Sequence, residues 1–151
     1  VSTVKANVFG GDCPLTTGAY LTERKNRRVL AEHAYQLVSA ALQVEDFDDS
    51  TLVTYQDGFH IQFGFSAMHP LLVMCLVRPM SPPAEEQLDI INDLNLNTVL
   101  GSHAINRTNN CYSFRITQWL DAELTEQRLF EILQRALEEA KKGYSILASC
   151  T

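Results

Sequence analysis

The sequence predicts an α+β fold whose elements follow the order helix, three strands, helix, two strands, helix. Apolar residues recur with helical spacing near 22–44, 84–95 and 126–143, and hairpin-length loops join β-rich runs between them. Strands joined by such short loops run antiparallel, so we expect one antiparallel sheet. The chain has 151 residues, close to the usual length of one domain. We expect residues 22–151 to form that domain.

The first helix is expected to follow an irregular N-terminal arm. Residues 1–21 contain three glycines and one proline and show no sustained periodicity. From Thr22 to about Val44, apolar residues fall on one side of a helix. They are Leu30, Ala34, Leu37, Val38 and Ala41.

A basic run, RKNRR at residues 24–28, would occupy the first turns of this helix. The helix dipole favours anions at that end, so the run could bind an anion. The alternative is a solvated helix face, which is the commoner meaning of a single charge run. We favour the solvated face.

An acidic turn and a hairpin come next. The segment EDFDDS at 45–50 lacks the glycine and the glutamate that an EF-hand loop needs for calcium, so we interpret it as a polar turn. Asp57-Gly58 predicts a tight hairpin turn. The strand that follows alternates, which places His60 on its wetter face as an incidental histidine. Its core face is expected to carry Phe59, Ile61, Phe63 and Phe65.

The segment LLVMCLV at 71–77 is apolar at every position and lies between two prolines. A strand of this kind presents apolar side chains to both faces of its sheet. One face must then be covered by another segment, a second subunit or a client protein. We expect a partner to contact Leu72, Met74 and Leu76.

A short helix and a second hairpin follow. AEEQLDIINDLN at 84–95 places Leu88, Ile91 and Leu94 on one side, after a serine and two prolines that are typical of a helix start. TVLGSHAI and CYSFRIT then predict two strands joined by the turn NRTNN. The sequon within this turn, at 106–108, is interpreted as accidental because the chain shows no sign of a secretory context.

The last helix is expected to begin after Thr125 as N-cap and to end at Gly143. Glu126 at its start and Lys141 and Lys142 at its end would agree with the helix dipole. One face is apolar and carries Leu129, Leu133, Ala136, Leu137 and Ala140.

One pair of residues could support catalytic chemistry. His103 and Cys111 flank the NRTNN turn and could pair as base and thiol nucleophile. A reactive cysteine usually lies in an electropositive pocket or at a helix N-terminus, whereas Cys111 begins a predicted strand. The glycine-rich phosphate and dinucleotide motifs and the nucleophile elbow are absent. The spacings of the cysteines and histidines do not predict a metal site. We therefore expect no enzyme activity, cofactor or small-molecule ligand.

The overall charge argues against two classes of binding partner. A formal net charge of -6 disfavours nucleic acid and anionic membranes. The sequence contains no window apolar enough to cross a bilayer and no basic, apolar start typical of a secretory signal. We expect a cytoplasmic protein.

The region 88–144 resembles the YbjN family of bacterial proteins. The resemblance lies in the helix ending INDLN, the strand TVLGSHAI, a polar turn, the strand CYSFRIT and the closing helix ELTEQRLFEILQRALEEA. It implies an α-β-β-β-α-β-β-α fold like that of type III secretion chaperones, with helices on one side of a curved antiparallel sheet and frequent homodimerisation. The family is described as a sensory transduction regulator, and no catalytic residue carries over.

Together these observations predict a non-enzymatic protein-binding module that is a homodimer and acts as a regulator or chaperone-like factor for an unknown protein partner. A dedicated type III secretion chaperone that binds an effector is the second hypothesis. A thiol-dependent enzyme using Cys111 and His103 is the third.

Overall fold

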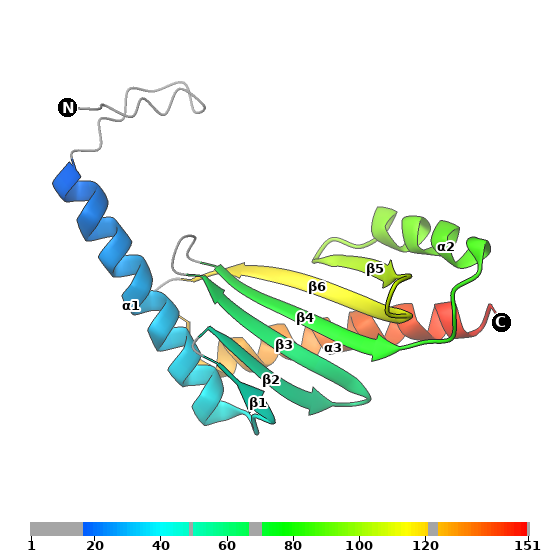
Figure 1. The fold of residues 1–151 in the computed structure, drawn as a ribbon, viewed down its shortest axis with the longest axis horizontal. Helices are drawn as coiled ribbons and strands as arrows, with labels where there is room; N and C mark the ends of the chain where they lie inside the picture. The colour runs from blue at the N-terminus through cyan, green and yellow to red at the C-terminus, as the bar shows by residue number, and fades with distance from the viewer. Residues whose placement is uncertain (1–16, 49, 67–70, 121–123, 151) are drawn as a thin grey trace.

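The computed structural model describes residues 17–48, 50–66, 71–120 and 124–150 (Figure 1). These residues form three helices and six strands, in the order α1 (Thr17–Ala41), β1 (Asp46–Phe47), β2 (Thr51–Gln56), β3 (Phe59–Ser66), β4 (Leu71–Pro79), α2 (Glu85–Leu96), β5 (Ser102–Asn106), β6 (Cys111–Trp119) and α3 (Glu126–Ala148).

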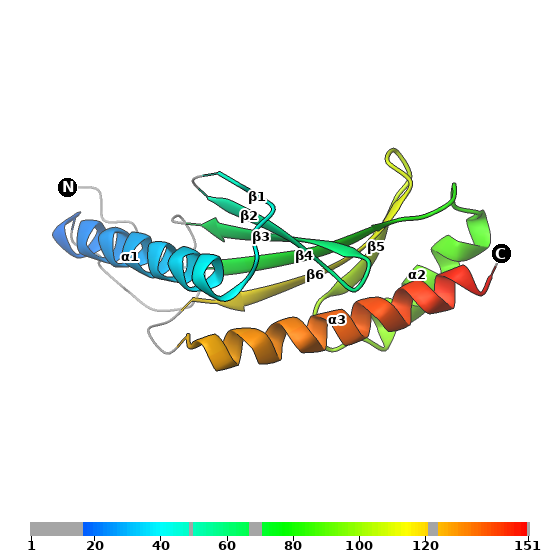
Figure 2. The same cartoon turned by 90° about the horizontal axis from the view of Figure 1, so that it is seen from below.

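All six strands belong to one antiparallel sheet with the spatial order β1-β2-β3-β4-β6-β5. The three helices lie on the same side of this sheet, and α3 runs along its length (Figures 1 and 2). The α+β class and the one-sided helical layer are therefore confirmed. None of the described helices is long and apolar enough to cross a membrane.

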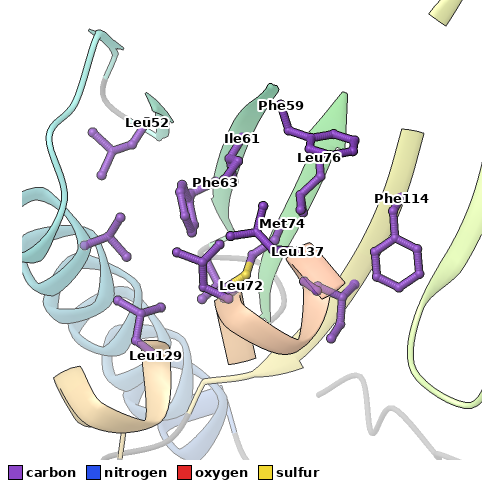
Figure 3. Close-up of a cluster of buried hydrophobic side chains, with 14 of the residues drawn as sticks. Leu52, Phe59, Ile61, Phe63, Leu72, Met74, Leu76, Phe114, Leu129 and Leu137 are labelled. Carbon is purple, nitrogen blue, oxygen red and sulfur yellow. The ribbon is translucent and has the colours of Figure 1, made fainter. Parts of the chain in front are cut away.

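The core fills the space between the sheet and helices α1 and α3 (Figure 3). Directly opposed residues of antiparallel strands share a face. The register aligns Leu52 with Phe63, Phe63 with Met74 and Met74 with Ile116. The predicted alternation of β3 is confirmed, since its buried residues are Phe59, Ile61, Phe63 and Phe65.

Two turns have the backbone geometry that their sequences predict. Asp57 and Gly58 have φ of 54° and 88°, as a tight two-residue hairpin requires. In the second turn, Asn110 has φ of 48°. There Asn106 Oδ1 accepts hydrogen bonds from the backbone N–H groups of Thr108 and Asn109.

The N-terminal part of the fold differs from expectation in two places. Helix α1 begins at Thr17 rather than Thr22 and ends at Ala41 rather than Val44. A glycine such as Gly18 costs a helix only about 1 kcal/mol relative to alanine, which does not stop a helix of 25 residues. The acidic segment is not a turn throughout, because Asp46 and Phe47 form β1 and pair with β2. After them, Asp48 Oδ1 accepts a hydrogen bond from the backbone N–H of Ser50.

The predicted strand TVLGSHAI is shorter than expected, since β5 starts at Ser102. Thr98 Oγ1 donates to the carbonyl of Leu94, which holds the chain close to the end of α2. Gly101 has φ of 77°, and a Cβ there would lie 2.4 Å from the carbonyl oxygen of Arg115. The segment before Ser102 is therefore a bend rather than a strand.

Helix α3 does not end at Gly143 but continues to Ala148. The glycine lies where the helix comes nearest to the sheet. A Cβ at this position would be 2.5 Å from Tyr112 Oη and 2.6 Å from His103 Nδ1. Lys141 is thus not at the helix end, and it instead forms a 2.7 Å ion pair with Asp57 in the first hairpin turn.

Candidate functional site

Strand β4 has one face in the core and one face that no described helix covers. Leu72, Met74 and Leu76, the residues expected to contact a partner, point toward the helices and are at most 1% exposed. The three are covered by the chain's own helices, because α1 and α3 pack on that face (Figure 3). The surface of β4 that a partner can reach is the opposite one.

The outer face of the sheet, which we define by Val53, Val73, Cys75, Val77 and Trp119, is apolar near its centre. The four central residues come from β2 and β4 and are half-buried by their neighbours alone. Trp119, paired with Leu71, is 65% exposed. A large apolar ring exposed on an open sheet face is typical of a protein contact surface.

Polar groups border this outer face. Tyr55, 52% exposed, lies opposite His60, with their rings 5.1 Å apart. Arg115 lies opposite Cys75 in the neighbouring strand. Burial raises the pKa of the Cys75 thiol, and the nearby Arg115 guanidinium opposes that shift. Arg115 thus places a cation beside the apolar side chains of the outer face.

The catalytic pair suggested by the second hairpin does not form. His103 lies opposite Phe114 and Cys111 lies opposite Asn106. Because successive side chains of a strand point to opposite faces, His103 faces the helices and Cys111 faces outward. The thiol therefore has no access to this imidazole. Counting residues through the hairpin could have shown this, once its register was fixed.

His103 has a structural role, since it is 3% exposed and both ring nitrogens are hydrogen-bonded. The hydroxyl of Thr98 donates its hydrogen bond to the backbone carbonyl of Leu94. Thr98 Oγ1 therefore accepts a hydrogen bond from the His103 Nε2–H group, 3.1 Å away. Nδ1 is then the acceptor for the Tyr112 hydroxyl at 2.6 Å. Burial lowers the pKa of His103 and raises that of Tyr112. His103 therefore links the loop that follows α2 to strands β5 and β6.

The basic run lies on α1, two turns beyond the helix start. Because the helix begins at Thr17, the cations are not at the positive end of its dipole, and the predicted conflict disappears. Lys25 and Arg28 are exposed. Arg28 also borders a depression of about 400 Å³ beside Glu32, Tyr35 and Phe65. Anion binding by the basic run stays a prediction.

A groove of about 480 Å³, which we call the α3 groove, runs between helix α3 and the 97–100 loop. Phe114, Ile116 and Ala136 line its floor. Its loop side carries Val99, 95% exposed, and Leu100. Its helix side carries Glu131, Gln134, Arg135, Glu138 and Glu139. The sequence did not reveal this groove, because residues 98–100 were expected to belong to a strand.

The described residues contain no group of three or more His, Cys, Asp or Glu side chains that could hold a metal ion. In the part of the chain that the structure describes, every buried side-chain nitrogen and oxygen has a hydrogen-bond partner. Cys75, Cys111 and Cys150 are free thiols. Cys13 and His69 lie outside the described residues.

Comparison of the sequence with known families shows the family of the chain. The profile of the YbjN family, described as "Putative bacterial sensory transduction regulator", matches residues 27–147. The chain belongs to the YbjN family. The match spans the sheet and most of all three helices. Among curated proteins, none is similar enough in sequence to count as a relative.

Solved structures share the fold at low sequence identity. YbjN from E. coli has a TM-score of 0.57 and 8% identity, over 74% of this chain and 86% of its own. A chain of the ExsC–ExsE complex has a TM-score of 0.59 and 17% identity, over 82% and 93%. The Yersinia pestis type III secretion chaperone SycH, solved with a fragment of YscM2, has a TM-score of 0.52 and 12% identity, over 75% and 98%. The family and E. coli YbjN are described as putative regulators, and SycH is described as a type III secretion chaperone.

Proposed function

We propose that this YbjN-family chain is a non-enzymatic protein-binding module, a regulator or chaperone-like factor that works as a homodimer in the cytoplasm. The observation that carries the proposal is the one-sided helical layer. It leaves the outer face of the sheet without a covering helix (Figure 2). On that face Val73, Cys75 and Val77 are half-buried and Trp119 is exposed. Burial of such apolar surface contributes about 25 cal/mol per Å² to association.

The outer face suits an extended or amphipathic segment of another protein. Its apolar centre would supply the burial, and Tyr55 and Trp119 would supply large rings of the kind that concentrate binding energy. Arg115 would favour an acidic group on the partner. The three free thiols, Cys75, Cys111 and Cys150, suit a reducing compartment such as the cytoplasm.

A dedicated type III secretion chaperone that binds an effector is the second candidate. It is supported by neighbours solved with a polypeptide bound, which include SycH with a YscM2 fragment and the HopA1–SchA chaperone–effector complex. A partner encoded beside a secretion apparatus would favour this candidate over a general regulator.

Site-specific photo-crosslinking in the native host tests the use of the outer face. A photoreactive residue placed at Trp119 or Tyr55 is expected to capture one protein at defined stoichiometry, identified by mass spectrometry. The same residue at exposed Glu86 on α2 is the control. Equal capture from all three positions, or none from the outer face, would contradict the proposal.

A further inference from the structure

The α3 groove has an apolar wall and a rim that is mainly acidic. Val99 and Leu100 expose their side chains on the loop side. Glu131, Glu138 and Glu139 on the helix side form no ion pair with the described residues. Arg135 is the one cation among the residues that line the groove. This arrangement fits a segment that carries an apolar side chain flanked by cations.

The first part of helix α1 has that chemistry. It extends beyond the end of the sheet in both ribbon views (Figures 1 and 2), and residues 25–30 are not buried. Lys25, Arg28 and Val29 are spaced i, i+3 and i+4, so they are neighbours on one face of the helix. Val29 is 58% exposed, and neither cation forms an ion pair with the described residues.

One chain therefore carries two complementary surfaces that lie apart within the monomer. We propose that the α3 groove of one copy receives the 25–29 segment of helix α1 from a second copy. Val29 packs against Val99 and Leu100, while Lys25 and Arg28 face the glutamates of α3. The exchange is reciprocal, so the product is a closed dimer. This inference rests on the homodimer in the proposed function and specifies its geometry.

The contact explains two features that the monomer leaves unexplained. Val99 is almost fully exposed in a loop held in place by hydrogen bonds of Thr98 and Asn97. Lys25 and Arg28 are exposed on one side of α1 and form no ion pair with the described residues of the monomer. The proposed contact also leaves the outer face of the sheet open for a different protein.

Charge reversal on each surface gives a specific test. Sedimentation and light scattering should show the wild-type chain at twice its monomer mass, with weaker association at high salt. The variants Lys25→Glu/Arg28→Glu and Glu131→Lys/Glu138→Lys should each raise the dissociation constant by at least about tenfold. Mixing the two variants should restore dimers, because each mixed contact again pairs opposite charges. Glu45→Lys, exposed and outside the groove, is the control and should dimerise normally.

Val99→Ser supplies a second test that leaves charge unchanged. The side chain is too exposed for the substitution to disturb folding, and it should also weaken the dimer. A wild-type dimer that neither charge variant weakens, or no recovery on mixing, would overturn this geometry but leave the homodimer intact. A monomeric wild-type chain would overturn both. Assemblies that grow beyond two copies would overturn the reciprocal exchange.

The single tryptophan separates this geometry from a dimer formed through the sheet. Trp119 lies on the outer face, so its emission should stay constant when the dimer is diluted into monomers. A shift of emission to longer wavelength on dilution would show that the outer face is the dimer interface, and would overturn the proposed contact.

Discussion

The hydroxyl of Tyr112 donates a 2.6 Å hydrogen bond to Nδ1 of His103, in a site where both side chains are buried. Asn95 of α2 is hydrogen-bonded to the backbone of His103, and α3 closes over the pair at Gly143. The pair therefore holds together strand β6, which contributes to the outer face, and helix α3, which forms one side of the α3 groove.

Removing the phenolic hydroxyl should destabilise the fold. Tyr112→Phe leaves Nδ1 of His103 buried without a donor, at a cost of about 1–3 kcal/mol in the free energy of unfolding. Urea denaturation followed by circular dichroism measures the change. Tyr55→Phe, on the exposed outer face, is the control and should leave the free energy of unfolding unchanged. Equal stability of the Tyr112→Phe and wild-type proteins would show that the hydrogen bond contributes nothing.

Stability should fall as the pH is lowered below about 6.5, the ordinary pKa of histidine. Burial is the main cause of the lowered pKa of His103; Glu139 on α3 opposes the shift and Lys142 adds to it. Below pH 6.5 the unfolded chain binds a proton at this position that the folded chain does not, so protons favour unfolding. The stability that depends on unprotonated His103 is fully present above pH 6.5 and is lost progressively as the pH falls below it.

Urea midpoints between pH 5.0 and 7.5 measure this effect. His103→Gln should flatten the pH dependence in that window, whereas His60→Gln, on the exposed outer face, should retain it. A wild-type slope that survives in His103→Gln would assign the effect to another group.

Gly143→Ala should destabilise the protein although alanine is the better helix former. A Cβ at this position would overlap with Tyr112 Oη and His103 Nδ1, and such overpacking costs about 1–3 kcal/mol. Adding Tyr112→Phe removes one of the two clashes, so the two substitutions together should cost less than the sum of their separate effects. Thermal melts of the single and double variants measure this. Ser145→Ala, exposed on the same helix, is the matched control and should be close to neutral.

The two faces of β4 should respond differently to truncation. Leu76→Ala opens a cavity under the helices and should cost about 2–5 kcal/mol of unfolding free energy. Val77→Ala, half-buried on the outer face, should cost clearly less. Urea denaturation of both variants compares their losses of unfolding free energy. A larger loss for Val77→Ala would show that the two faces have been assigned the wrong way round.

Local sequence patterns were sufficient for most of the fold. The alternation in β3, the Asp57-Gly58 turn and the apolar stripe of α3 each act over a few residues, so the elements and the core face of β3 could be predicted. The site was harder to predict. LLVMCLV showed an apolar strand, but its pattern is the same on both faces and could not indicate that the helices cover Leu72, Met74 and Leu76.

What the sequence determined by itself is the order of helices and strands and the absence of a recognisable catalytic motif. Only the tertiary structure decided that the helices cover Leu72, Met74 and Leu76, that Gly143 lies inside a helix, and that Val99 borders a groove. The reason is physical. A residue's preference for helix, strand or turn depends on its neighbours in the chain, whereas the role of Gly143 depends on Tyr112 and His103, which approach it only when α3 packs on the sheet.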